Sequence, residues 1–144
     1  MNTASQRLAA VLDQQIRCAE AMLETLANEG RALADGDQAA LALATDAKAK
    51  VVAALEQLET ERRALSSGKE PVHAEEWRRL RELIQRCKEQ NQRNGALLQA
   101  RAENGTIVKT VREVMLLNQT LDAALLKLSG WPSDMVAKRL KGRA

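Results

Sequence analysis

The feature that most constrains this chain is its shortage of residues that interrupt a helix. Only two prolines occur, Pro71 and Pro132, so long stretches are free to form continuous helices. The 25 alanines and 21 leucines are among the strongest helix formers. Aromatic and β-branched residues, which favour strands, are scarce, and there is no Phe or Tyr. The sequence therefore predicts an all-α fold.

Two helices joined by a short turn are predicted over residues 1–72. Apolar residues at three- and four-residue steps predict a first helix from Ala4 to Leu33 and a second from Gln38 to Leu65. Gly36 is expected to end the first helix in a left-handed conformation, and Asp37 to cap the second. Such a short connection favours an antiparallel hairpin. The second apolar stripe is weakened by Lys48 and Arg62, whose alkyl stems can nevertheless cover apolar surface.

A second domain, residues 73–130, opens with a helical pattern near Ala74. Its apolar stripe includes Asn91 and Asn94, which either fix the packing register or mark a helix end or a local widening. The pattern is compatible with one long helix to Leu128 or with two segments broken near Gly105. The expected architecture is an elongated antiparallel hairpin or bundle of three long helices.

Residues 106–130 contain the most amphipathic stretch of the chain. Its apolar arc is wider than a two-helix seam needs, so it either packs on the first hairpin or is partly open to another protein. Anchors at i, i+3, i+4 and i+7 are typical of helix-in-groove recognition. We call the following residues the predicted binding row: Val108, Val111, Val114, Met115, Asn118, Leu121, Leu125 and Leu128. Residues 131–144 are predicted to form a flexible basic tail.

Several classes of function are disfavoured by the residue types present. The single histidine, His73, lies in a predicted loop, and no clustered His or Cys residues offer metal ligands, so we expect no enzyme, metal site or cofactor. The net charge is −3 over residues 1–72 and +6 over residues 73–144. Without an aromatic platform or a known motif, this asymmetry does not indicate nucleic-acid binding.

A cytoplasmic location is expected from three features. The polar N-terminus lacks the apolar core of a signal peptide. No apolar run is long enough for a transmembrane helix, so no stable membrane insertion is expected. Cys18 and Cys87 are isolated on apolar helix positions, as expected of small buried side chains in a reducing compartment.

The sequence resembles the FlgN family of flagellar type III export chaperones. The resemblance rests on the first helix ending in Ala34-Asp35-Gly36-Asp37 and on a second helix with a central lysine. That second helix ends in a pattern that here reads Leu58-Glu59-Thr60-Glu61-Arg62-Arg63-Ala64-Leu65. The most specific part is Asn91-Gln92-Arg93-Asn94-Gly95, followed by a Leu-rich helix that ends in Leu128-Ser129-Gly130.

The resemblance implies a chaperone that binds hook–filament junction proteins by their C-terminal segments. It would prevent their premature assembly and deliver them to the cytosolic domain of a membrane protein at the export gate. The family's client contacts are attributed to its C-terminal helix, which corresponds to Val108–Leu128. Relatives often carry a tyrosine after this helix for docking at the gate; here the nearby aromatic is Trp131.

Two other classes of function are compatible with the residue pattern. One is a structural coiled-coil or helical-bundle protein without an export client. The other is binding to a membrane surface through the amphipathic C-terminal helix, although the charge on its polar face is modest and mixed in sign.

Overall fold

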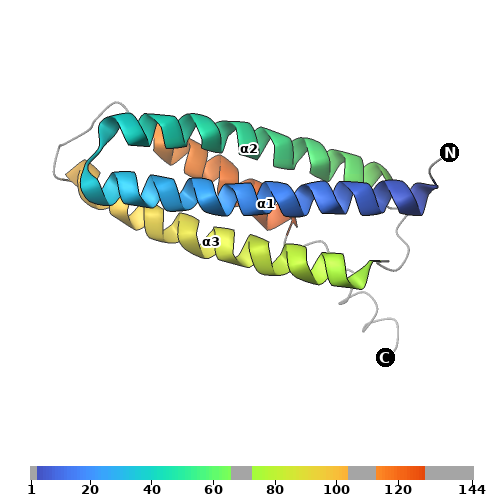
Figure 1. Cartoon of the computed structure of the whole chain (residues 1–144). Coiled ribbons are helices and arrows are strands. Elements are labelled where there is room, and N and C mark those ends of the chain that lie inside the picture. The colour runs from blue at the N-terminus through green and yellow to red at the C-terminus, as the bar shows by residue number, and fades with distance from the viewer. Residues whose placement is uncertain (1–2, 66–72, 104–112, 129–144) are drawn as a thin grey trace.

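The computed structural model describes residues 3–65, 73–103 and 113–128, all of which lie in or next to helices (Figure 1). Three long helices are α1 (Ala4–Asp35), α2 (Gln38–Leu65) and α3 (Ala74–Glu103). Residues 113–128 form a fourth helix, which we call the C-terminal segment. The all-α class is confirmed, and no strand occurs in these three ranges.

Over residues 3–65, 73–103 and 113–128, the expectation of three long helices is corrected to four helices, and of the two alternatives for residues 74–128 the two segments are the correct one. α3 ends at Glu103, and the C-terminal segment is a separate helix that runs in the opposite direction. Periodicity could not decide this, because a helix and its continuation share the same apolar spacing whether or not the chain turns between them. Gly105 itself lies outside the described residues.

The predicted turn between the first two helices is confirmed in detail. Gly36 adopts a left-handed backbone with φ 67°, and its N–H donates to the carbonyl of Ala32. The Asp37 carboxylate accepts from the N–H of Ala40 at 3.0 Å and so caps α2. α1 begins with a capping box between Thr3 and Gln6.

Contacts between helices define their directions. α1 and α2 are antiparallel, since Gln15 meets Glu59 and Glu29 meets Lys48. α1 and α3 run parallel, because three hydrogen bonds join residues that are all 68 positions apart: Cys87 to Ala19, Asn94 to Leu26, and Arg101 to Leu33.

The C-terminal segment packs along α3 and beside α2. Asn91 of α3 contacts Asp122, while Leu98, further along α3, shares a core cluster with Val114. The segment is therefore antiparallel to α3, and the chain forms two hairpins that lie side by side in the same direction (Figure 1).

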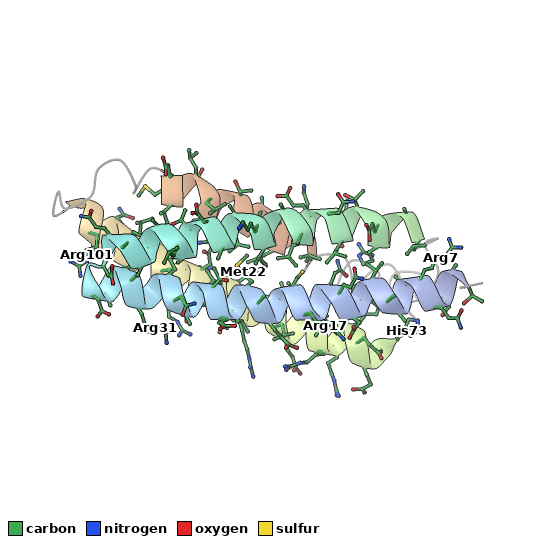
Figure 2. All side chains as sticks on the ribbon, turned by 45° about the horizontal axis from the view of Figure 1, so that its top comes forward. Arg7, Arg17, Met22, Arg31, His73 and Arg101 are labelled. Atoms are coloured by element: carbon green, nitrogen blue, oxygen red, sulfur yellow. The ribbon has the colours of Figure 1, made fainter. Side chains whose placement is uncertain are left out.

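An aliphatic core runs along the interior of this four-helix bundle. Its main cluster draws on all four helices and includes Leu12, Met22, Leu26, Leu55, Leu80, Ile84, Leu121 and Leu125. At the end next to the α1–α2 turn, Arg101 of α3 donates to the carbonyls of Leu33 and Ala34, as its position in Figure 2 illustrates. This side chain satisfies carbonyls that the end of α1 would otherwise leave without a partner.

Candidate functional site

The predicted binding row lies on the inner face of the C-terminal segment wherever the structure describes it. Its buried members are Val114, Asn118, Leu121, Leu125 and Leu128. Met115 is 36% exposed at the edge of this face. Val108 and Val111 lie outside the described residues, as does Trp131.

The other three helices cover this inner face. Leu121, Leu125 and Leu128 belong to the main core cluster, and Val114 packs with Leu33, Leu41 and Leu98 in a second cluster. Of the two possibilities that periodicity left open, the described part of the row is therefore packed on the bundle. A protein partner could reach these residues only after the C-terminal segment leaves its place.

A buried ammonium group lies at the centre of the bundle, where all four helices meet. The side chain of Lys48 has no exposed surface. Its Nζ donates to both carboxylate oxygens of Glu29 at 3.1 Å, to Asn91 Oδ1 at 2.9 Å, and to Asn118 Oδ1. The three ammonium protons thus have acceptors on three different helices, which is what a buried charge requires.

Asparagine amides extend this arrangement on α3. Asn94 Nδ2 donates to the carbonyl of Leu26 at 2.7 Å and to Glu29 Oε1 at 2.9 Å. Asn91 Nδ2 donates to Asp122 Oδ1 at 2.7 Å, at the edge of the C-terminal segment. We call these six residues the Lys48 layer: Glu29, Lys48, Asn91, Asn94, Asn118 and Asp122.

Two opposing effects act on the pKa of Lys48. Burial lowers the pKa of Lys48 below its usual value, while the negative charge and hydrogen bond of Glu29 and the charge of Asp122 act in the opposite direction. The acceptors therefore compensate in part for removing the ammonium from water. A replacement for any of them must supply an oxygen at the same place, or the buried charge becomes more costly.

A second polar layer lies further along α2. The Glu59 carboxylate accepts from Arg62 at 2.6 Å, from Arg63 at 3.1 Å and from Gln15 at 3.3 Å. The Arg62 guanidinium is buried and lies 5.3 Å from the ring centroid of Trp77, a cation–π distance. These five residues connect α1, α2 and α3.

Sequence reasoning missed the importance of Lys48 and Arg62. On the sequence alone, both residues weaken the apolar stripe of the second helix, yet both side chains are fully buried. The available signal was their position on the buried face together with Asn91 and Asn94 on the facing helix. Those asparagines sit inside a continuous helix, which favours their interpretation as residues that fix register.

Within the described ranges, no group of three or more His, Cys, Asp or Glu side chains could hold a metal ion. Over the same residues, no helix is long and apolar enough to cross a membrane. The side chains that the described helices bring together are aliphatic residues packed around two polar layers.

Comparison with models of protein families yields a match. The family model of the FlgN protein matches residues 1–104, which include α1, α2 and α3. No curated protein and no solved structure matches the chain. The match covers more than half of the chain and includes Glu29, Lys48, Asn91 and Asn94. The chain therefore belongs to the FlgN family, a family of flagellar export chaperones.

Proposed function

We propose that this protein is a cytoplasmic chaperone for hook–filament junction proteins and that it binds the amphipathic C-terminal segment of its client. Binding would keep that segment from assembling before export. The predicted binding row would make the contact, once the C-terminal segment has moved away from α1, α2 and α3. Family membership supports the chaperone role; the client and the surface are our proposal.

The observation that carries the proposal is the apolar inner face of the C-terminal segment. Four large aliphatic residues on it, Val114, Leu121, Leu125 and Leu128, are at most 3% exposed. Burying each such side chain is worth roughly 1.5–3 kcal/mol, so a face exposed by opening would need a new apolar cover. An amphipathic client helix would supply that cover at a similar gain, which makes the exchange of partners feasible.

Delivery to the membrane export gate is a separate part of the proposal. Trp131 follows the C-terminal segment by three residues and is the nearby aromatic available for docking to the cytosolic domain of a gate protein. A Trp131→Ala variant is expected to bind the client with unchanged affinity but to export it less. Equal export by this variant and the wild type would contradict the docking role.

Titration calorimetry with a C-terminal fragment of a junction protein tests client binding. The variant Leu121→Asp plus Leu125→Asp places two charges on the inner face and is expected to abolish binding. Circular dichroism should show that this variant loses no more helical signal than unfolding of the C-terminal segment alone would remove. If it loses more, hydrogen exchange of the wild type replaces the variant, and a bound fragment should change protection mainly in residues 113–128.

A matched control uses the exposed side of the same helix. Leu116→Asp plus Ala123→Asp adds the same charge at exposed positions and should leave the affinity unchanged. Unchanged binding by the inner-face variant, or equal loss in both variants, would overturn the proposed surface.

A second candidate function is a structural helical-bundle protein without a client. The closed packing of Val114, Leu121, Leu125 and Leu128 favours it, because a self-contained bundle needs no partner. The same calorimetry separates the two functions: a structural protein gives no heat of binding with any junction-protein fragment.

A further inference from the structure

The polar residues of the C-terminal segment restrict which helix can cover its inner face. Asn118 lies among the buried apolar residues of that face and is itself 8% exposed. Its side-chain oxygen accepts a hydrogen bond from the ammonium of Lys48 of α2. Covering Asn118 with an entirely apolar helix would leave this oxygen without a partner, which costs about ten-fold in affinity or more.

Asp122 lies one helical turn after Asn118 and adds a negative charge on the same side. Its carboxylate accepts from Asn91 at 2.7 Å, and its charge favours the protonated form of Lys48. The segment therefore presents two acceptors spaced i and i+4: Lys48 of α2 donates to Asn118, and the charge of Asp122 favours the ammonium without a direct hydrogen bond. In the closed molecule, α2 is a helix that covers part of this face and supplies the donor for Asn118.

The first part of the α2 stripe that faces the bundle interior, residues 41–55, has a simple composition. Leu41, Ala44, Val52 and Leu55 are buried apolar residues, and Lys48 lies between them. Over residues 41–55 the stripe is thus apolar except for one basic residue, whereas Glu59 and Arg62 of the second polar layer are buried further along α2. Lys48 meets an amide oxygen and a nearby carboxylate at the same level.

We propose that Asn118 and Asp122 make the binding row selective for an amphipathic client helix that carries a lysine or arginine in the middle of its apolar stripe. This inference rests on the proposed function, since it assigns the chemistry of the client that the row accepts. The client's basic side chain takes the place of Lys48 at the acceptor pair. Apolar residues on either side cover Val114, Leu121 and Leu125.

Synthetic peptides with the sequence of α2, Gln38–Leu65, serve as the probe, and fluorescence anisotropy measures their binding to the full chain. The full-length protein in this assay carries the substitutions Glu29→Gln and Lys48→Met. These remove its internal charge pair but keep Asn118 and Asp122. The affinity of the unsubstituted peptide should be higher than that of a peptide with Lys48→Met by about ten-fold or more. A peptide with Lys50→Met, a change at an exposed lysine, should bind like the unsubstituted one.

The preference must depend on the acceptors. Adding Asn118→Leu and Asp122→Asn to the chain should abolish the difference between the lysine and methionine peptides. Equal binding of these two peptides to the first chain, a difference that survives loss of the acceptors, or binding by neither peptide would overturn the inference.

Binding of the junction-protein fragment to the wild-type chain is measured alongside. If the fragment binds through Leu121 and Leu125 while the peptides show no lysine preference, the proposed function stands and this inference fails. If the peptides show the preference and the fragment does not bind, the selective surface stands and the assigned client is wrong.

Discussion

At the scale of single residues, the Lys48–Glu29 pair is the feature that demands most of its surroundings. Both side chains have no exposed surface and lie 3.1 Å apart. An ion pair taken out of water gives little net stability compared with an apolar pair of the same size. Removing one partner is far more harmful, because the other charge is then buried without compensation. The pair is therefore better understood as a device that fixes how the helices align than as a source of stability.

The Lys48→Met variant should lower the free energy of unfolding by about 3–5 kcal/mol, since it leaves the Glu29 carboxylate buried without its cation. The double variant Glu29→Gln plus Lys48→Met should recover most of this loss. Urea unfolding followed by circular dichroism measures both. A double variant that is less stable than the single one would contradict the view that the uncompensated charge causes the damage.

Cys87 should make stability depend on alkaline pH. Burial raises the pKa of its thiol to about 12, from about 9.0 in the unfolded chain. Between these values the folded state keeps a proton that the unfolded state releases, so stability is full below pH 9 and falls as the pH rises toward 12. The slope contributed is about 1.4 kcal/mol per pH unit.

Urea unfolding at several pH values from 8 to 10.5 checks this for the wild type and for Cys87→Ala. The variant should show a smaller decline than the wild type, since it lacks the buried thiol. Cys18 is present in both proteins, so the difference between them reports Cys87 alone. Parallel curves would show that the buried thiol does not contribute.

At the scale of helices, two glycines inside helices differ in whether the neighbouring side chains leave room for a Cβ atom. A Cβ added to Gly30 of α1 would lie 2.8 Å from Asn94 Oδ1, too close for a real contact. A Cβ added to Gly95 of α3 would meet its nearest neighbour, Asn118 Nδ2, at 3.8 Å. Gly30 thus allows α1 and α3 to approach at the Lys48 layer, whereas Gly95 leaves room for a side chain.

Gly30→Ala should therefore destabilise the protein by about 1–3 kcal/mol, because Asn94 is held by two hydrogen bonds and cannot easily move. Gly95→Ala should stabilise it by up to about 1 kcal/mol through helix propensity alone. Thermal unfolding of the two variants provides a matched comparison. If Gly30→Ala were as stable as Gly95→Ala, the close approach at Asn94 would not be a constraint.

At the scale of the whole molecule, α1 and the C-terminal segment differ in how extensively they pack on the other helices. α1 packs on both α2 and α3 over most of its length. The C-terminal segment is only 16 residues long. Asn118 and Asp122 attach it to the other helices by hydrogen bonds. Local opening is expected where buried contacts are fewest, so this segment is the part best suited to exchange partners.

Hydrogen exchange measured by mass spectrometry should show amides of residues 113–128 opening with a lower free energy than those in the centre of α1. Asn118→Leu should accelerate exchange in the segment, because it removes an acceptor from the buried ammonium. A bound junction-protein fragment should change protection mainly there. Exchange in the segment that is as slow as in α1 would mean that it opens only when the whole protein unfolds.

The sequence by itself determined where α1 and α2 lie and how the hairpin between them turns. Helix propensity, apolar spacing and capping are local properties, so they predicted the hairpin, the left-handed Gly36 and the cap at Asp37. The inner face of the C-terminal segment was also predictable, because one helix fixes which of its residues share a side.

Only the tertiary structure decided what covers each face. Spacing along one helix says that Lys48 shares a side with leucines, but its partners Glu29, Asn91 and Asn118 come from helices 19 to 70 residues away. The same limit applies to the fourth helix. Its direction, and the burial of a row that the sequence left either packed or open, depend on contacts between distant residues, which local periodicity does not contain.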